Sequence, residues 1–346
     1  MVRTHRAARH PERPPLTRRR LGKRWLRPAL GVAFGLLLLY VAEVVARLAN
    51  VAPAYVADQV GGWRMMSEMR AAKMDTREGA SFVLSTNADG LRTSLPVQHG
   101  SRLRVALLGD STVFGWGADE GGTVADGLQA ALDADGGPPV EVLNAAQPGY
   151  TTTQAAVFFD RVVAKYRPDL VVQFLPMHDH NLVLVSDREY LGGASGPLST
   201  VRVTLAQHSR LYQALRQAIF PLASEPFLLP GSESAEPRVP RVSDDERRDN
   251  LDGVRARLAT WGGKLALGHV PFTGDLTSST PPPRVGEDWA QAYASEHGLV
   301  IVDLRACCGP DGGGLVLEHD PGHLRAEGNL QAGAAGAAAV RAALGG

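Results

Sequence analysis

Ser111 stands where a buried strand is expected to turn, at the end of the stretch Arg104-Val-Ala-Leu-Leu-Gly-Asp-Ser111. The uninterrupted apolar run 105–108 predicts a parallel strand covered on both faces, and Gly109 ends it. In open α/β sheets, ligands bind beyond the carboxyl ends of the strands. A serine hydroxyl at that edge is a candidate nucleophile, although Gly-Asp-Ser is also an ordinary turn sequence.

Two residues that could activate this serine lie far downstream, in Glu318-His-Asp-Pro-Gly-His323. Asp320 and His323 are three residues apart across an expected Pro-Gly turn, so the carboxylate can reach one imidazole nitrogen and leave the other for Ser111. This spacing makes a Ser-His-Asp triad plausible, the arrangement that attacks acyl groups. Alternatively, Asp320 caps a turn and His323 is an ordinary surface histidine. A metal site lacks a third ligand of suitable spacing.

The elements that must position these residues alternate along the chain. Strands are expected at about 104–109, 140–143, 170–175, 264–270 and 299–304. Helices are expected from Thr123, from Thr151–Thr153 to about 166, from Ser243 to about 261, at 285–297 and at 328–344. Thr123 with Asp126, and Ser243 with Glu246, have the spacing of capping boxes. This alternation is typical of a doubly wound β-α-β sheet.

Residues 182–242 interrupt the alternation with one helical patch at about 205–220 and a stretch rich in Ser, Pro and Glu. We interpret them as an insertion. An excursion of this kind above a parallel sheet either shapes the substrate site or is a surface loop.

The formal net charge of zero conceals a basic amino terminus. Residues 1–27 contain ten Lys and Arg and one acid, a charge of +9 that leaves −9 for the remainder. The uncharged run 28–42 follows at once, and Glu43 and Arg47, spaced to pair on a helix, extend it to residue 48. We therefore predict a basic cytoplasmic tail (1–27), a transmembrane signal anchor (28–48) and a stalk (49–84).

The positive flank predicts that everything beyond about residue 50 is extracytoplasmic, in a single-pass protein of the inner or plasma membrane. A cleaved signal peptide is the alternative, but no small-x-small site follows the apolar run. Nucleic-acid binding by the basic tail is not expected, because a tail beside a membrane segment has this simpler explanation. The adjacent Cys307 and Cys308 are equally compatible with a vicinal disulfide and with two thiols.

Four blocks together resemble the SGNH/GDSL hydrolase superfamily. They are Gly109-Asp-Ser111, the segment Asn144 to Gly149, a polar turn with Asp179, and Asp320-x-x-His323. The resemblance covers about 85–345 and keeps the order and strand context of the blocks. The apolar amino terminus and Asn87-x-Asp-Gly-Leu-Arg92, a turn in which Gly90 suits positive φ, are similar to the membrane-anchored bacterial branch.

The resemblance implies a three-layer α/β/α, flavodoxin-like fold with a five-stranded parallel sheet over residues 85–346. It implies that Ser111 attacks an ester carbonyl, that His323 acts as general base and then acid, and that Asp320 orients the imidazole. The backbone N–H groups of Ser111 and Gly149 would form part of the oxyanion hole. No metal and no other cofactor are expected.

One block departs from the family, which usually has Gly-x-Asn-Asp where this chain has Pro176-Met-His-Asp179. His178 replaces the asparagine whose amide is the third oxyanion donor, and a neutral imidazole offers one N–H for the same role. Asp179 is expected to be a structural hydrogen-bonding residue.

We therefore expect an extracytoplasmic serine esterase or deacylase acting on acyl esters, possible substrates being those of cell-envelope glycans or lipids. Transfer of the acyl group to a sugar hydroxyl would use the same triad, so an O-acyltransferase remains an alternative. A catalytically weak envelope binding protein of the same fold is the second alternative, which His178 favours.

Overall fold

The computed structural model describes residues 25–48, 55–58, 62–76, 79, 81–93, 102–193, 201, 204–205, 208–219, 238–272, 275–276, 286–307, 312–318 and 320–345. The chain divides into two units, Met1–Asn50 and Val51–Gly346. Most of the expected basic tail lies outside the described residues.

A five-stranded parallel sheet forms the centre of the second unit. Its strands are β5 (Leu103–Leu108), β6 (Val140–Asn144), β7 (Leu170–Phe174), β10 (Lys264–His269) and β11 (Ile301–Asp303). They lie in the order β11-β10-β7-β5-β6, and every neighbouring pair is parallel. The expected α/β fold with five parallel strands is confirmed.

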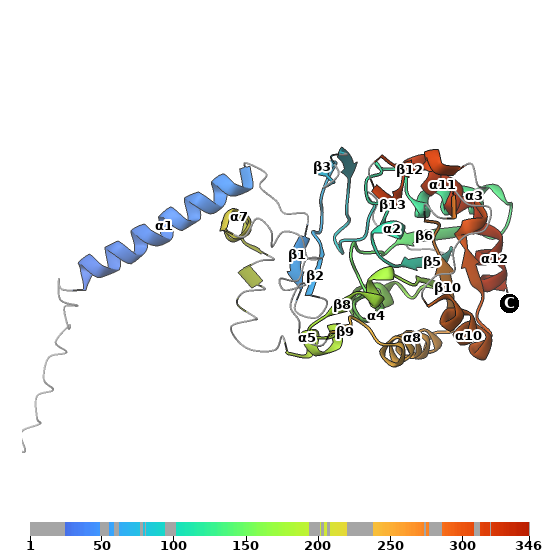
Figure 1. Ribbon diagram of the computed structural model, residues 1–346. Helices are drawn as coiled ribbons and strands as arrows, with labels where there is room; N and C mark the ends of the chain where they lie inside the picture. Colours follow the sequence, from blue (N-terminus) through green and yellow to red (C-terminus); the bar gives the residue numbers. More distant parts are fainter. Residues whose placement is uncertain are drawn as a thin grey trace, which may run out of the picture. The chain divides into compact units, whose positions relative to one another are not determined.

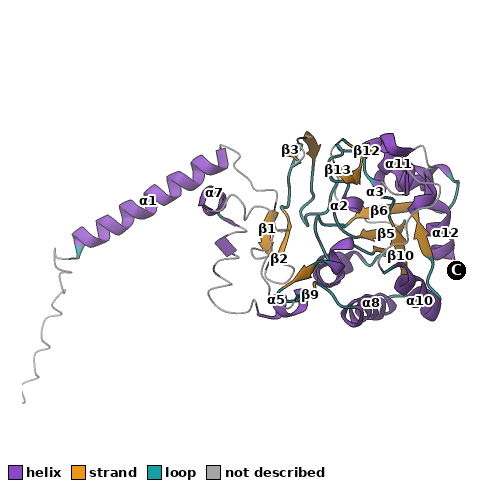
Figure 2. Ribbon diagram, in the orientation of Figure 1, coloured by secondary structure: helices purple, strands orange, loops and turns teal. Residues whose placement is uncertain are grey.

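Helices cover both faces of this sheet, as Figures 1 and 2 show. One face packs against α3 (Val124–Ala134), α11 (Ala326–Ala335) and α12 (Ala337–Gly345), and the other against α4 (Thr152–Phe158), α8 (Asp244–Ala259) and α10 (Glu287–His297). Side chains alternate along a strand, so Val105 and Leu107 of β5 join the first core and Ala106 and Leu108 the second. All four are fully buried, which explains the unbroken apolar run.

Both capping boxes expected from the sequence are present, Thr123 with Asp126 before α3 and Ser243 with Glu246 before α8. A third, Thr151 with Gln154, begins α4. The helix expected to continue to about 166 changes character after Phe158: a π-helical segment (Phe159–Val163) and a 3-10 turn (Ala164–Tyr166) follow. The expected final helix divides into α11 and α12 at Gly336.

Two glycines allow α3 and α11 to come into close contact. A Cβ at Gly333 would lie 2.1 Å from the carbonyl oxygen of Val124, and one at Gly127 would lie 2.2 Å from that of Leu330. Neither position can accept a larger side chain unless the helices separate. Only two residues separate His323 from the start of α11. The packing of α11 against α3 therefore also fixes the position of the strand that carries His323.

Residues expected to form a stalk instead contain strands that belong to the second unit. β1 (Tyr55–Asp58) pairs with β2 (Gly62–Met65), and β3 (Ala72–Asp75) pairs with β4 (Ser81–Leu84), both antiparallel. Met65, Phe82 and Leu84 are at most 1% exposed and join the core beside the sheet. These three side chains are buried, and the unit therefore extends on the amino-terminal side of residue 85.

The first unit contains α1 (Leu26–Leu48), a helix long and apolar enough to cross a membrane. A signal sequence has the same properties. Glu43 and Arg47 form the ion pair expected from their spacing, with Arg47 Nε 2.8 Å from Glu43 Oε1.

The insertion is anchored at its two ends by a short antiparallel ladder of β8 (Leu182–Val183) with β9 (Val239–Pro240). Within it lie α5 (Asp187–Gly193) and α7 (Arg210–Ile219), the latter inside the expected helical patch. Residues 220–237 lie outside the described residues. Elsewhere, Cys307 is disulfide-bonded, and Cys308 also lies outside them.

Candidate active site

Ser111, His323 and Asp320 are hydrogen-bonded in series. His323 Nε2 lies 2.7 Å from Ser111 Oγ, and His323 Nδ1 lies 2.7 Å from Asp320 Oδ2. Asp320 is buried, whereas His323 and Ser111 are partly accessible. The arrangement can move a proton from the serine hydroxyl to the imidazole while the carboxylate stabilises the resulting positive charge.

Ser111 is the first residue of α2 (Ser111–Phe114), which begins directly after β5. Asp110 caps this helix, since its Oδ1 accepts hydrogen bonds from the N–H and hydroxyl of Thr112 at 3.0 and 2.6 Å. Gly115 ends the helix in the left-handed conformation, with φ of +83°. The Ser111 hydroxyl is therefore carried by a single helical turn, α2, between β5 and Gly115.

Arg92 holds the other end of α2. Its guanidinium donates to the carbonyl oxygens of Phe114 at 3.0 Å and Gly115 at 2.5 Å, and also to that of Ala118. Burial lowers the pKa of Arg92 to about 10, so the side chain remains charged at neutral pH. The sequence indicated the turn before Arg92 but not this role, because the partners of the guanidinium lie more than twenty residues away.

Asp320 and His323 lie in β13 (Asp320–Leu324), which pairs with β12 (Val316–Leu317). The expected turn is therefore an irregular strand, in which the Gly322 N–H donates to Asp320 Oδ1 at 3.1 Å. Burial acts to raise the pKa of Asp320, but the hydrogen bond and charge of His323, with the Gly322 N–H, outweigh it and hold this pKa below its ordinary value. The orienting carboxylate is thus ionised over the neutral range.

Gly149 occupies a turn after β6. The Tyr150 N–H donates to the Gln147 carbonyl oxygen at 3.2 Å, Pro148 holds the second position and Gly149 the third with φ of +72°. This is the pattern of a type II turn, which requires glycine at that point. No described residue accepts a hydrogen bond from the N–H of Gly149 or of Ser111.

His178 lies in a 3-10 turn (Met177–His180) after β7. Its Nδ1 is 3.3 Å from Asn181 Nδ2, an amide nitrogen that can only donate. This contact favours the tautomer with its proton on Nε2, the nitrogen that lies 3.8 Å from Asp110 Oδ2 beside α2. In this tautomer the Nε2–H group of His178 faces Asp110, the residue before Ser111.

Asp179 is fully buried and structural. It accepts hydrogen bonds from the Thr152 N–H at 2.9 Å, the Thr152 hydroxyl at 2.8 Å and Arg247 Nε at 2.9 Å. Burial raises the pKa of Asp179, while the charge of Arg247 and these hydrogen bonds oppose the rise. The expected structural role agrees with these contacts, which join the loop of His178 to the start of α4.

The five predicted site residues therefore come from the carboxyl ends of β5, β6 and β7 and from β13. Among the described residues, no group of three or more His, Cys, Asp and Glu side chains is placed to hold a metal ion.

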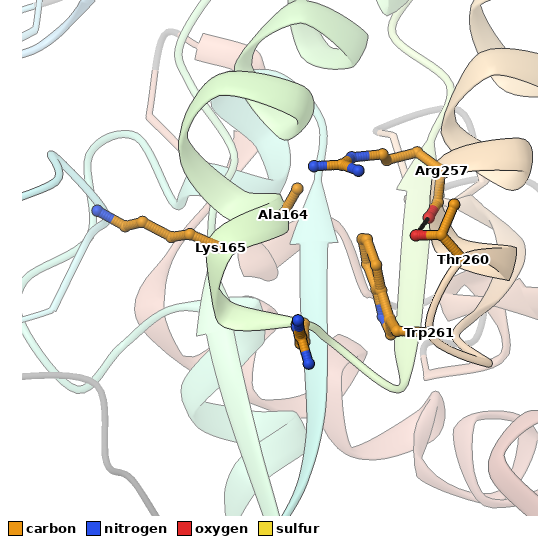
Figure 3. A pocket seen from close by; sticks show the side chains of 6 residues that line it. Ala164, Lys165, Arg257, Thr260 and Trp261 are labelled. Atoms are coloured by element: carbon orange, nitrogen blue, oxygen red, sulfur yellow. Dashed lines mark hydrogen bonds between the residues drawn. The ribbon is translucent and has the colours of Figure 1, made fainter.

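A recess of about 570 Å³ lies elsewhere (Figure 3), at the amino ends of β7 and β10, lined by Ala164, Lys165, Arg167, Arg257, Thr260 and Trp261. Because the strands are parallel, this is the sheet edge opposite Ser111. Lys165 pairs with Asp89, and Arg257 Nε lies 3.4 Å from Asp160. The recess contains no serine, histidine or carboxylate in its lining and is separate from the candidate active site.

The three-layer fold presents a serine beyond the carboxyl end of β5, the edge at which ligands bind in open α/β sheets, and the family match below makes the chain a serine ester hydrolase. The chain belongs to the GDSL-like lipase/acylhydrolase family, whose model matches residues 107–330.

Solved structures of three bacterial or environmental enzymes are similar to this chain. A lipase/acylhydrolase from Enterococcus faecalis is 19% identical, with 70% of this chain and 96% of that chain covered and a TM-score of 0.43. An α/β hydrolase from the Lake Arreo metagenome is 18% identical (70% and 95% covered, TM-score 0.40). An acetylxylan esterase from Geobacillus stearothermophilus is 15% identical (72% and 97% covered, TM-score 0.39). Family membership follows from the sequence match, since all three TM-scores are below 0.5.

No curated protein matches the chain closely enough to count as a relative.

Proposed function

We propose that this serine ester hydrolase is an extracytoplasmic esterase or deacylase in which Ser111, His323 and Asp320 form the catalytic triad. The observation that carries the proposal is the unbroken hydrogen-bond series from Ser111 Oγ through both nitrogens of His323 to Asp320. Hydrogen bonds of 2.7 Å at both nitrogens suit a base that must be oriented and then stabilised as it gains a proton.

In the first step, Ser111 Oγ attacks the ester carbonyl carbon while its proton passes to His323 Nε2. The negative charge develops on the carbonyl oxygen, where the N–H groups of Ser111 and Gly149 and the Nε2–H of His178 are the proposed donors. His323 then protonates the departing alkoxide, which leaves as the alcohol, and Ser111 carries the acyl group.

In the second step, water attacks the acyl-enzyme. His323 accepts a proton of the water. The second tetrahedral intermediate then collapses with cleavage of the bond between the acyl carbon and Oγ, and His323 Nε2 returns the proton to Ser111 Oγ as the carboxylic acid leaves. If a sugar hydroxyl replaces water, the same sequence of proton transfers gives an O-acyltransferase.

The substrate class proposed is an acyl ester of a cell-envelope glycan or lipid. Support comes from the helix α1, which is long and apolar enough to anchor the chain, and from the basic residues before it. In this arrangement the amino terminus is cytoplasmic, α1 spans the membrane once, and the hydrolase domain faces the envelope.

The test uses the full-length protein in detergent micelles. Purified wild type is incubated with 4-nitrophenyl acetate and, separately, with a fluorophosphonate followed by intact-mass measurement. We expect ester cleavage and a single phosphonate adduct that Ser111→Ala lacks. His323→Ala should lose nearly as much activity, because the members of a triad act as a unit.

The exposed pair of Arg188 with Asp249 supplies a control, since Arg188→Gln alters a surface contact on the same protein and should leave turnover unchanged. Retention of most of the activity in both Ser111→Ala and His323→Ala would reject the triad. Adding a sugar alcohol to the assay separates the two reactions, because transfer would yield an acylated acceptor in place of free acid.

A further inference from the structure

The indole of Trp63 donates a hydrogen bond from Nε1 to the carbonyl oxygen of Pro148, at 3.2 Å. Trp63 belongs to β2, which precedes the residues that match the hydrolase family. We propose that Trp63 is a positioning residue for the oxyanion hole, acting through the peptide that joins Pro148 to Gly149. This inference rests on the proposed function, in which the Gly149 N–H is an oxyanion donor.

The carbonyl of Pro148 and the N–H of Gly149 belong to one peptide group. That group is planar, and no cis peptide bond occurs among the described residues, so the C=O and N–H bonds point in opposite directions. A donor that fixes the Pro148 oxygen therefore fixes the direction of the Gly149 N–H. It also polarises the peptide, which strengthens the hydrogen bond that the N–H can give on its other side.

The hydrogen bond of the type II turn does not fix the orientation of the peptide between Pro148 and Gly149. That hydrogen bond joins the first and last residues, Gln147 and Tyr150, and leaves the middle peptide unbonded within the turn. Rotation of the middle peptide interconverts common turn types and would aim the Gly149 N–H elsewhere. The Trp63 hydrogen bond opposes that rotation.

Trp63 is itself held against the turn from two sides. The Tyr150 hydroxyl donates to the Trp63 carbonyl oxygen at 2.5 Å, and the two rings meet edge to face with centroids 6.0 Å apart. On the other side, the guanidinium of Arg241 lies 5.9 Å from the centre of a Trp63 ring and donates to the Gly149 carbonyl oxygen at 3.3 Å.

Arg241 is in turn fixed by a buried ion pair from the insertion. Its Nε and Nη2 donate to the two oxygens of Asp187 at 3.0 and 2.9 Å, and both side chains are 8% exposed. A bidentate pair of this kind sets the orientation of a guanidinium closely. The amino-terminal strands and the insertion thus meet at the one turn that carries Gly149.

The test is Trp63→Phe in the full-length protein, which removes the N–H donor and keeps an aromatic ring. We expect kcat for 4-nitrophenyl acetate to fall by about tenfold or more, short of the roughly 10²–10³ lost with a complete oxyanion donor. KM and the thermal midpoint should change little. The rate of fluorophosphonate inactivation should fall in parallel with kcat, because that reaction also develops negative charge at the oxyanion position.

Trp261 provides a matched control. Its Nε1 donates to the Pro168 carbonyl oxygen at 3.0 Å, the same indole-to-proline hydrogen bond, but at the opposite edge of the sheet (Figure 3). Trp261→Phe should leave kcat and the inactivation rate unchanged. If Trp63→Phe does not fold, replacement of Trp63 by benzothienylalanine removes only the N–H and should give the same loss of kcat.

The proposal is overturned if the folded Trp63 variant keeps its kcat within twofold, or loses no more than Trp261→Phe, while Ser111→Ala is inactive. In that case the triad stands and only the positioning role fails. If Ser111→Ala retains the activity, the proposed function itself fails, and the role of Trp63 fails with it.

Discussion

Arg247 and Asp179 form a buried ion pair, with Nε 2.9 Å from Oδ2 and side chains that are only 2% and 1% exposed. The pair joins α8 to the turn that carries His178, and Asp179 extends the connection to Thr152 at the start of α4. A charge pair removed this far from water contributes mainly through the penalty incurred when one partner is lost.

Arg247→Met should therefore destabilise the fold by about 3–5 kcal/mol, because Asp179 would be left buried without a counter-charge. Urea unfolding of the purified protein, followed by tryptophan fluorescence, measures this loss. Arg248→Met is the control one residue away: Arg248 pairs with Glu296 at 2.8 Å at the protein surface, where little change in the free energy of unfolding is expected. Equal losses in the two variants would contradict the assignment.

His178→Ala should lower kcat by roughly 10²–10³ with little change in KM, the effect of losing one oxyanion donor. His178→Asn should retain or improve activity, since its amide restores an N–H at a similar reach. Steady-state kinetics on an aryl ester measure both. Unchanged turnover in His178→Ala would show that His178 lines the site but is not an oxyanion donor. An inert wild type that gains activity through His178→Asn would instead indicate a binding protein.

The folded state should lose stability on mild acidification through His180. Burial, followed by the positive charge of Arg247, lowers the pKa of His180, and Asp179 and Asp244 only partly oppose this. The unfolded chain, with a histidine pKa of about 6.5, then binds more protons. This contribution to stability is present above about pH 6.5 and is lost as the pH falls through the folded-state value.

Urea midpoints of wild type and His180→Gln at about pH 7.5 and about pH 5 isolate this contribution. The decrease toward acid should be smaller in the variant, because the other histidines are common to both proteins. An equal decrease would show that His180 does not contribute.

Protease added to spheroplasts should digest the hydrolase domain, because the basic flank of α1 predicts a cytoplasmic amino terminus. The full-length protein with a carboxyl-terminal epitope allows this to be followed by immunoblot. Protection until lysis would reject the proposed topology, and appearance of a shortened soluble form would favour cleavage after α1 over anchoring.

The strands of the central sheet and the residues of the hydrogen-bonded series could be predicted from the sequence alone. Val105 to Leu108 lie between two covered faces, and only a run of apolar side chains satisfies both. Asp320 and His323 are close in the chain, so their spacing already limits how they meet, and Ser111 follows a strand whose end is a recognisable ligand position. Each of these patterns involves residues that are close together in the chain, so it can be recognised in the sequence.

The contacts that orient the site were decided by the tertiary structure. Trp63 meets Pro148 across 85 residues, Arg92 reaches the end of the serine helix, and Arg247 reaches Asp179 across 68 residues. Nothing in the pattern around an isolated tryptophan or arginine specifies such a partner, because the pairing depends on how loops pack after the sheet has formed. The same limit explains why residues 49–84 were expected to form a stalk. The short strands within 62–84 have little sequence signal of their own, and they are held by burial of Met65, Phe82 and Leu84 in a core built by the rest of the chain.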